Sequence, residues 1–231
     1  MDSKPHEVRL RLLANGYEPL PLSGKSPNYK GWNHIEITER WLTNFRRSRI
    51  YTNTGLRCGG SSRVIGIDID VDLPEIVDDL LAAFQRANLD THFVRIGRAP
   101  RRMLLFRLTA GQPMVAKLRS GVFAYVQPDQ EDRLCSVEVL GECHQLVAHG
   151  VHPDTGQEYT WPDRNPFENK LKKLPEIATE QLRAVVKIAD DIFEHHGLSP
   201  TSDKRSADNM GLLADAYDLT DDMLFTCVRE E

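Results

Sequence analysis

The chain has 231 residues, of which 40% are hydrophobic and 27% charged, and its formal net charge is −5. This composition is typical of a globular protein and excludes a long disordered chain or a uniform positive coat for nucleic acid. No apolar run approaches the roughly 18 residues that span a bilayer, and the first residues contain no signal-peptide apolar region. We therefore expect a cytoplasmic protein without membrane contacts.

Helices and strands are predicted in turn along the chain. A short amphipathic helix over 6–15 ends at Gly16, and Thr38 is a candidate N-cap for a second helix. Pro74 fits the first turn of a third. The expected helices cover 6–15, 38–47, 74–89, 179–197 and 208–218, and the expected strands cover 17–22, 49–57, 64–71, 92–97, 102–108, 134–140 and a hairpin-like pair within 144–161.

The stretch VIGIDIDVD, residues 64–72, places three aspartates in an apolar strand. Because alternate residues of a strand share a face, Ile65, Ile67 and Ile69 point one way. Asp68, Asp70 and Asp72 point the other, where clustered carboxylates favour Mg²⁺ or Mn²⁺. One alternative is a solvated edge strand. A second is a haloacid-dehalogenase-type phosphatase, whose D-x-D-x-T or D-x-D-x-V loop fails here at Asp72.

Charge is segregated around this strand. Residues 68–79 contain six acids and no base, whereas residues 95–107 contain five arginines and no acid. Arginine side chains suit phosphate oxygens, so the two stretches together indicate a site for metal ions and phosphates. Glu138, in CSVEVLG, is a candidate third carboxylate from another strand. A solvent-facing acid and a solvated arginine turn are the alternatives. The cysteines and histidines match no zinc template.

Six segments in order resemble the N-terminal primase–polymerase domain of phage, plasmid and other mobile-element replication proteins, a branch of the archaeo-eukaryotic primase superfamily. They are PLPLSGKSPNYKGW, NTGLRCGG, VIGIDIDVD, VRIGRAPRRMLLFR, VEVLG and VAHGVHPDTGQEYTW, within residues 8–165. The resemblance implies that Asp68, Asp70 and Glu138 are the catalytic, metal-binding acids. The family's middle motif usually presents a histidine to the nucleotide, but this chain has Arg98, Arg101 and Arg102 there. His149 and His152 are further candidate nucleotide contacts.

The resemblance implies an α+β fold in which an RRM-like antiparallel or mixed sheet carries the acids. A smaller αβ lobe from residues 1–60 would pack beside it, and a helical C-terminal segment would follow. We expect a catalytic domain over 1–175, then a segment over 176–231 that leads to a further domain outside this chain.

The implied reaction is nucleotidyl transfer with Mg²⁺ or Mn²⁺, as a DNA primase or DNA polymerase. The implied partners are a single-stranded DNA template, NTP or dNTP, and a replicative helicase domain or protein. Two alternatives stay open. One is a degenerate primase-like module that binds nucleic acid without polymerising, and the other is a metal-dependent nuclease or phosphatase.

Overall fold

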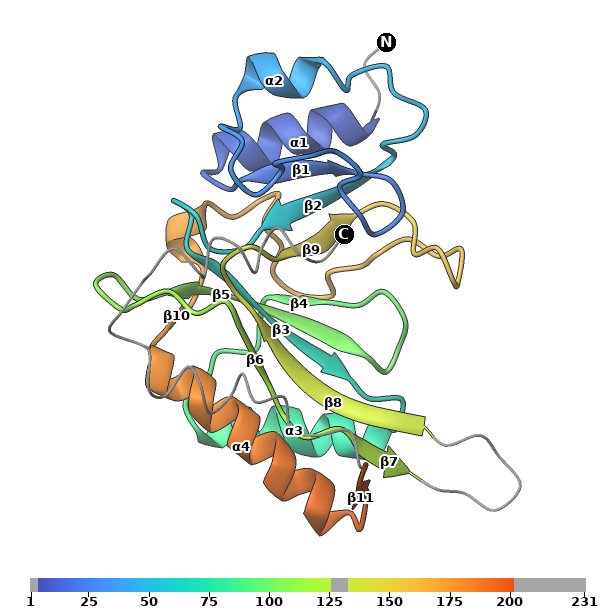
Figure 1. The fold of residues 1–231 in the computed structure, drawn as a ribbon, viewed down its shortest axis with the longest axis vertical. Coiled ribbons are helices and arrows are strands. Elements are labelled where there is room, and N and C mark those ends of the chain that lie inside the picture. The colour runs from blue at the N-terminus through green and yellow to red at the C-terminus, as the bar shows by residue number, and fades with distance from the viewer. Residues whose placement is uncertain (1–3, 126–132, 202–231) are drawn as a thin grey trace.

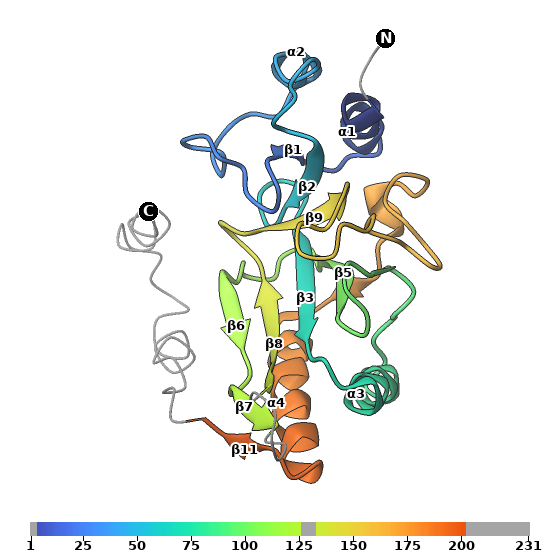
Figure 2. The same cartoon turned by 90° about the vertical axis from the view of Figure 1, so that its right-hand side faces the viewer.

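The computed structural model describes residues 4–125 and 133–201, which form a mixed α/β fold with two sheets and four α-helices in the described part (Figure 1). The N-terminal lobe contains helix α1 (Lys4–Ala14), strand β1 (Pro19–Leu22), helix α2 (Glu39–Thr43) and strand β2 (Asn53–Arg57). Strand β9 (Gln145–His149), far along the chain, completes this antiparallel sheet in the order β1-β2-β9. Figures 1 and 2 show α1 and α2 at one end of the molecule, away from α3 and α4.

The larger sheet has the strand order β10-β5-β3-β8-β7-β11, with β4 paired to β5 and β6 paired to β8. Its pairs are antiparallel except for the parallel β10–β5 pair. Strand β3, the DID strand, lies between β5 and β8. The strands are β3 (Val64–Asp70), β4 (Val94–Arg95), β5 (Arg102–Leu108), β6 (Lys117–Arg119), β7 (Phe123–Tyr125), β8 (Arg133–Leu140), β10 (Glu176–Ile177) and β11 (Ser199–Pro200).

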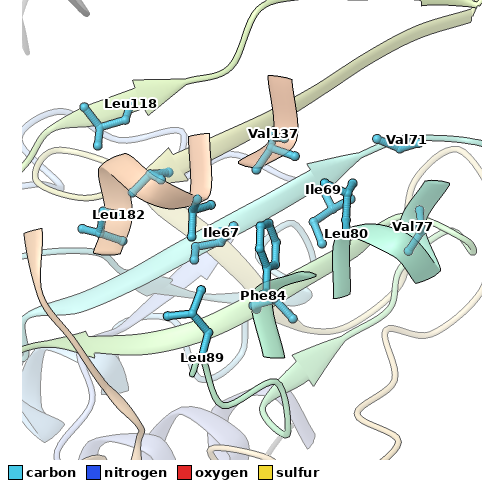
Figure 3. Close-up of a cluster of buried hydrophobic side chains, with 14 of the residues drawn as sticks. Ile67, Ile69, Val71, Val77, Leu80, Phe84, Leu89, Leu118, Val137 and Leu182 are labelled. Carbon is cyan, nitrogen blue, oxygen red and sulfur yellow. The ribbon is translucent and has the colours of Figure 1, made fainter. Parts of the chain in front are cut away.

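One face of the larger sheet is covered by helices α3 (Pro74–Arg86) and α4 (Thr179–His195) (Figure 2). Ile65, Ile67 and Ile69 of β3 point into this layer and are fully buried. Figure 3 shows Ile67 and Ile69 against Phe84 of α3, with Leu182 of α4 in the same cluster. The alternation predicted for residues 64–71 is therefore confirmed.

The opposite face of β3 is covered toward its start by the small sheet. A Cβ atom added at Gly66 would lie 3.0 Å from the side chains of Leu146 and Met103, so the packing is tight where β9 crosses β3. Val64 and Leu146 belong to a second buried cluster there. This cover does not close over Asp68 and Asp70, which line a pocket farther along the same face.

Most elements expected from the sequence are confirmed in place, with three differences. Helix α2 ends at Thr43, although Thr38 caps it by accepting a hydrogen bond from the Trp41 amide at 3.2 Å. The hairpin within 144–161 is reduced to β9 and an isolated bridge between Val151 and Glu158. Strands β6, β7, β10 and β11 were not predicted. The helix expected at 208–218 lies outside the described residues.

A boundary at residue 175 falls inside a continuous hydrophobic core. Strand β10 pairs with β5, and Leu182, Val185 and Phe193 of α4 are fully buried in the cluster that contains Ile67. The described part of the C-terminal segment therefore packs on the larger sheet. No helix in the described residues has the length and apolar character needed to cross a bilayer.

Candidate active site

A row of side chains crosses five strands of the larger sheet on the face away from α3 and α4. The register pairs Asp68 with Glu138 on one side and with Met103 on the other. Met103 pairs with Arg95, and Glu138 pairs with Arg119. Directly opposed residues share a face and have Cβ atoms about 4.5–5.5 Å apart. The two predicted acids of neighbouring strands are therefore adjacent, with an arginine at each end of the row.

Few groups of the protein offset the negative charge of the Asp68 carboxylate. It makes no hydrogen bond or ion pair with any residue in the described part of the chain. Burial raises its pKa to about 6, and the negative charges of Asp70 and Glu138 push in the same direction, while Arg95 and Arg101 oppose them. A partly buried anion in this situation gains from a cation that binds beside it.

Asp72 organises the arginines of the turn after β4. Arg101 donates from Nε and Nη2 to the two Asp72 carboxylate oxygens, each at 2.7 Å, and Arg98 Nη2 donates to Oδ2 at 2.6 Å. These bonds lower the pKa of Asp72 to about 2, with the Arg101 hydrogen bonds as the largest cause. Arg101 also forms an ion pair with Asp70. Asp72 therefore positions Arg98 and Arg101, and Asp70 forms a second ion pair with Arg101.

A pocket of about 290 Å³ lies against these groups. Tyr159 and His152 form part of one wall, with ring centroids 5.4 Å apart, and burial lowers the pKa of His152. The Arg95 guanidinium lies 4.7 Å from the Tyr159 ring centroid, in a cation–π contact. The charged residues that line the pocket are Lys25, Asp68, Asp70, Arg95, Arg98, Arg101 and Arg102.

Arg95 has no hydrogen bond or ion pair to any carboxylate of the described residues, and its Nε is buried without a partner. Burial lowers its pKa, and the nearby Asp68 charge opposes that shift. A partly buried guanidinium that lines a pocket, packs on an aromatic ring and has no hydrogen-bonded carboxylate is suited to an anionic ligand.

The predicted site residues occupy different positions around this pocket. Arg98 and Arg101 line it and are held by Asp72. Arg102 also borders it, but pairs with Ile69 in the register, so its side chain starts from the helix-covered face. His152 lines the pocket. His149 lies apart from that lining, with its ring 5.8 Å from that of Phe167.

Glu138 lies beside Asp68 but has its own cations. Lys117 Nζ is 3.2 Å from Oε2, and Arg119 Nε is 3.1 Å from Oε1. In the described part of the chain, no three histidine, cysteine or acidic side chains are already gathered closely enough to hold an ion.

Sequence reasoning missed Lys25, Tyr159, Lys117 and Arg119 and did not single out Arg95. Lys25, from the loop after β1, lines the pocket and forms an ion pair with Asp154 at 3.0 Å. Tyr159 follows the Val151–Glu158 bridge and is 6% exposed, so it was indistinguishable from an ordinary core tyrosine. The arginine-rich stretch over residues 95–107, which indicated phosphate binding, does include Arg95.

A pocket with carboxylates on a central strand and arginines around it has the side chains that suit metal ions and phosphates. The model of one family, bifunctional DNA primase/polymerase, N-terminal (Prim-Pol), matches residues 9–177. The chain therefore belongs to the Prim-Pol family, which confirms the resemblance and implies nucleotidyltransferase activity on DNA, with a DNA template and nucleotides as partners. No curated protein matches the chain.

Proposed function

We propose that the chain carries out template-directed nucleotidyl transfer in the pocket bordered by Asp68 and Asp70. One observation carries this proposal. A partly buried carboxylate, Asp68, and a partly buried guanidinium, Arg95, face the same pocket, and each lacks a hydrogen-bonded or ion-paired partner among the described residues. A metal-bound nucleotide supplies a cation for the first and phosphate oxygens for the second.

Asp68, Asp70 and Glu138 are the residues that would hold Mg²⁺ or Mn²⁺. The donor set fits, because carboxylate oxygens on neighbouring strands are hard ligands and Asp68 has no hydrogen-bonded or ion-paired partner among the described residues. When bound, two such ions would activate the 3′-hydroxyl and stabilise charge on the phosphates. Glu138 would bind a metal ion only after its ion pairs with Lys117 and Arg119 break. We therefore expect its contribution to metal binding to be the smallest of the three.

The arginines would hold the triphosphate. Arg95 offers a fixed guanidinium, while Arg98 and Arg101 extend from the turn and are aimed by Asp72. Arg101 contacts both Asp70 and Asp72, so it would neutralise Asp70 before substrate arrives and contact phosphate afterwards. These groups position charge and need no covalent step of their own.

The finer features of the proposal concern the fold and its context. We propose that the larger sheet is the RRM-like core of this family, that α4 is the expected helical C-terminal segment, and that the protein serves replication of a phage, plasmid or other mobile element beside a helicase. The rival is a primase-like module that binds nucleic acid without polymerising, favoured by the arginines that stand in place of the motif histidine.

The test is incorporation of labelled NTP or dNTP on single-stranded DNA, with and without a primer, in Mg²⁺ and in Mn²⁺. Asp68→Asn should abolish elongated products. Asp78→Asn, which removes an exposed charge on α3, is the matched control and should leave them unchanged. DNA binding without elongation by the wild type would favour the rival, and shortened strands would indicate a nuclease.

A further inference from the structure

An arginine-rich surface lies on the N-terminal lobe, away from the pocket residues discussed so far. From Arg40 to Ile67 the sequence contains six arginines and no aspartate or glutamate, although the whole chain has a net charge of −5. The first four of these arginines are exposed. We define the arginine surface as Arg40, Phe45, Arg46, Arg47, Arg49, Ile50 and Tyr51, which belong to α2 and the segment that follows it.

The arginines of this surface differ from those of the pocket in their partners. Arg98 and Arg101 are committed to carboxylates. Arg40, Arg47 and Arg49, in contrast, have no acidic group within ion-pair distance among residues 4–125 and 133–201. Their charges are therefore available to the phosphates of a polyanion.

Aromatic and apolar side chains are interleaved with these charges. Phe45 packs against Trp41 and Tyr51, with ring centroids 5.0 and 5.1 Å apart, and all three side chains are partly exposed. Ile50, between Arg49 and Tyr51, is 66% exposed. A duplex presents mainly phosphates to such a surface, whereas a single strand also offers bases that can pack on apolar and aromatic groups.

The arginine surface is held in place by buried contacts. Arg9 of α1 is fully buried and donates from Nη2 to the carbonyl oxygens of Tyr51 and Asn53, at 2.5 and 3.0 Å. The Tyr51 hydroxyl donates to the Asn28 carbonyl at 3.2 Å. The main chain that follows the exposed arginines is therefore ordered before any ligand binds.

One loop links this surface to the pocket. Lys25 lines the pocket, and Tyr29, four residues later, packs against Trp41, Phe45 and Tyr51. Four residues span at most about 14 Å. A linear polymer bound on the arginine surface would therefore need only a short extension to reach the pocket.

We propose that the arginine surface binds the single-stranded DNA template and leads it to the pocket. This inference rests on the proposed function, because it assigns the template of that same site. The recognition is sequence-independent: arginines contact phosphates, while Phe45, Ile50 and Tyr51 contact bases.

The test measures binding of a labelled single-stranded oligonucleotide by fluorescence anisotropy, in EDTA and without nucleotide, across a salt series. Arg47→Ala/Arg49→Ala removes two phosphate contacts. Each contact contributes about 0.7 to the slope of log affinity against log salt, so the slope should fall by roughly 1.4, which is roughly fifty-fold in affinity at about 50 mM salt. Arg47→Lys/Arg49→Lys keeps the charges and should retain most of the slope.

The matched control is Arg86→Ala/Lys187→Ala, which removes two exposed charges from α3 and α4 on the other side of the larger sheet and should leave binding unchanged. Equal losses in the test and control variants, or wild-type binding by Arg47→Ala/Arg49→Ala, would overturn the inference. Equal affinity for duplex and single strand would overturn the single-strand assignment. Because no nucleotide or metal is present, failure of the proposed chemistry alone would leave this binding result intact.

Discussion

Truncation after Pro175 should unfold the protein. This change removes β10 and α4, and with them five large side chains buried in the core: Ile177, Leu182, Val185, Phe193 and Leu198. A fully buried side chain of this size contributes about 1.5–3 kcal/mol, so the loss is roughly 8–15 kcal/mol. The net stability of a typical domain is about 5–15 kcal/mol, and the truncation therefore consumes most or all of it.

Far-UV circular dichroism and urea denaturation measure this outcome directly. A chain that ends at Thr201 keeps every element described here and should unfold cooperatively, so it is the control. Phe193→Ala is a milder version and should cost about 3–5 kcal/mol while leaving a folded protein that still binds nucleotide. A cooperative unfolding transition together with nucleotide binding in the chain that ends at Pro175 would refute the reasoning and restore a separable C-terminal segment.

Three further predictions concern the pocket. In metal-free protein at pH 8, Asp68→Asn should raise the free energy of unfolding by up to about 3 kcal/mol, because the pKa of Asp68 rises from 3.8 to about 6 in the folded state. The gain in the free energy of unfolding is full above pH 6 and disappears toward pH 4, where Asp68 is protonated in both the folded and the unfolded state. Asp70→Asn, which breaks the ion pair with Arg101, should show no gain. An equal gain in both variants, measured by urea denaturation, would contradict the argument. Glu138→Gln should reduce labelled-nucleotide incorporation less completely than Asp68→Asn, since Glu138 already has two cationic partners; wild-type incorporation would remove it from the site. Arg98→Ala should raise the nucleotide KM more than Arg102→Ala does, in a salt-sensitive way, and steady-state kinetics giving the reverse order would contradict the assignment of faces from the register.

The central strand was predictable because its pattern has only one consistent arrangement. A period of two that places isoleucines on one face and aspartates on the other can bury only the isoleucine face, and Ile67 and Ile69 do lie under the helices. The arrangement of Asp68 beside Glu138 was less accessible. Residue type suggested Glu138, but its position opposite Asp68 depends on a strand register set by contacts distant in sequence.

The cations around the acids were harder to predict. Lys117 and Arg119 lie on β6, a strand of three residues that is too short to show an alternating pattern. Arg98 and Arg101 were recognised as candidates, but their attachment to Asp72 depends on how the turn after β4 folds back. Lys25 reaches the pocket from a loop about 40 residues before β3, and only the packing of the two sheets brings it there.

The balance of charge in the pocket has a consequence for how its proposed ligands would enter. Five basic side chains and two acidic ones line it, but Asp72 and Asp154 pair with three of those bases, so the pocket without ligands has a small excess of positive charge although the whole chain is acidic. Divalent cations alone would add charge to an already positive site, while a nucleotide alone would bring phosphates toward Asp68 and Asp70. Entering together, they would neutralise each other, and Arg101 would exchange Asp70 for phosphate. We therefore propose that a metal ion and a nucleotide would bind this arginine-lined pocket as one unit.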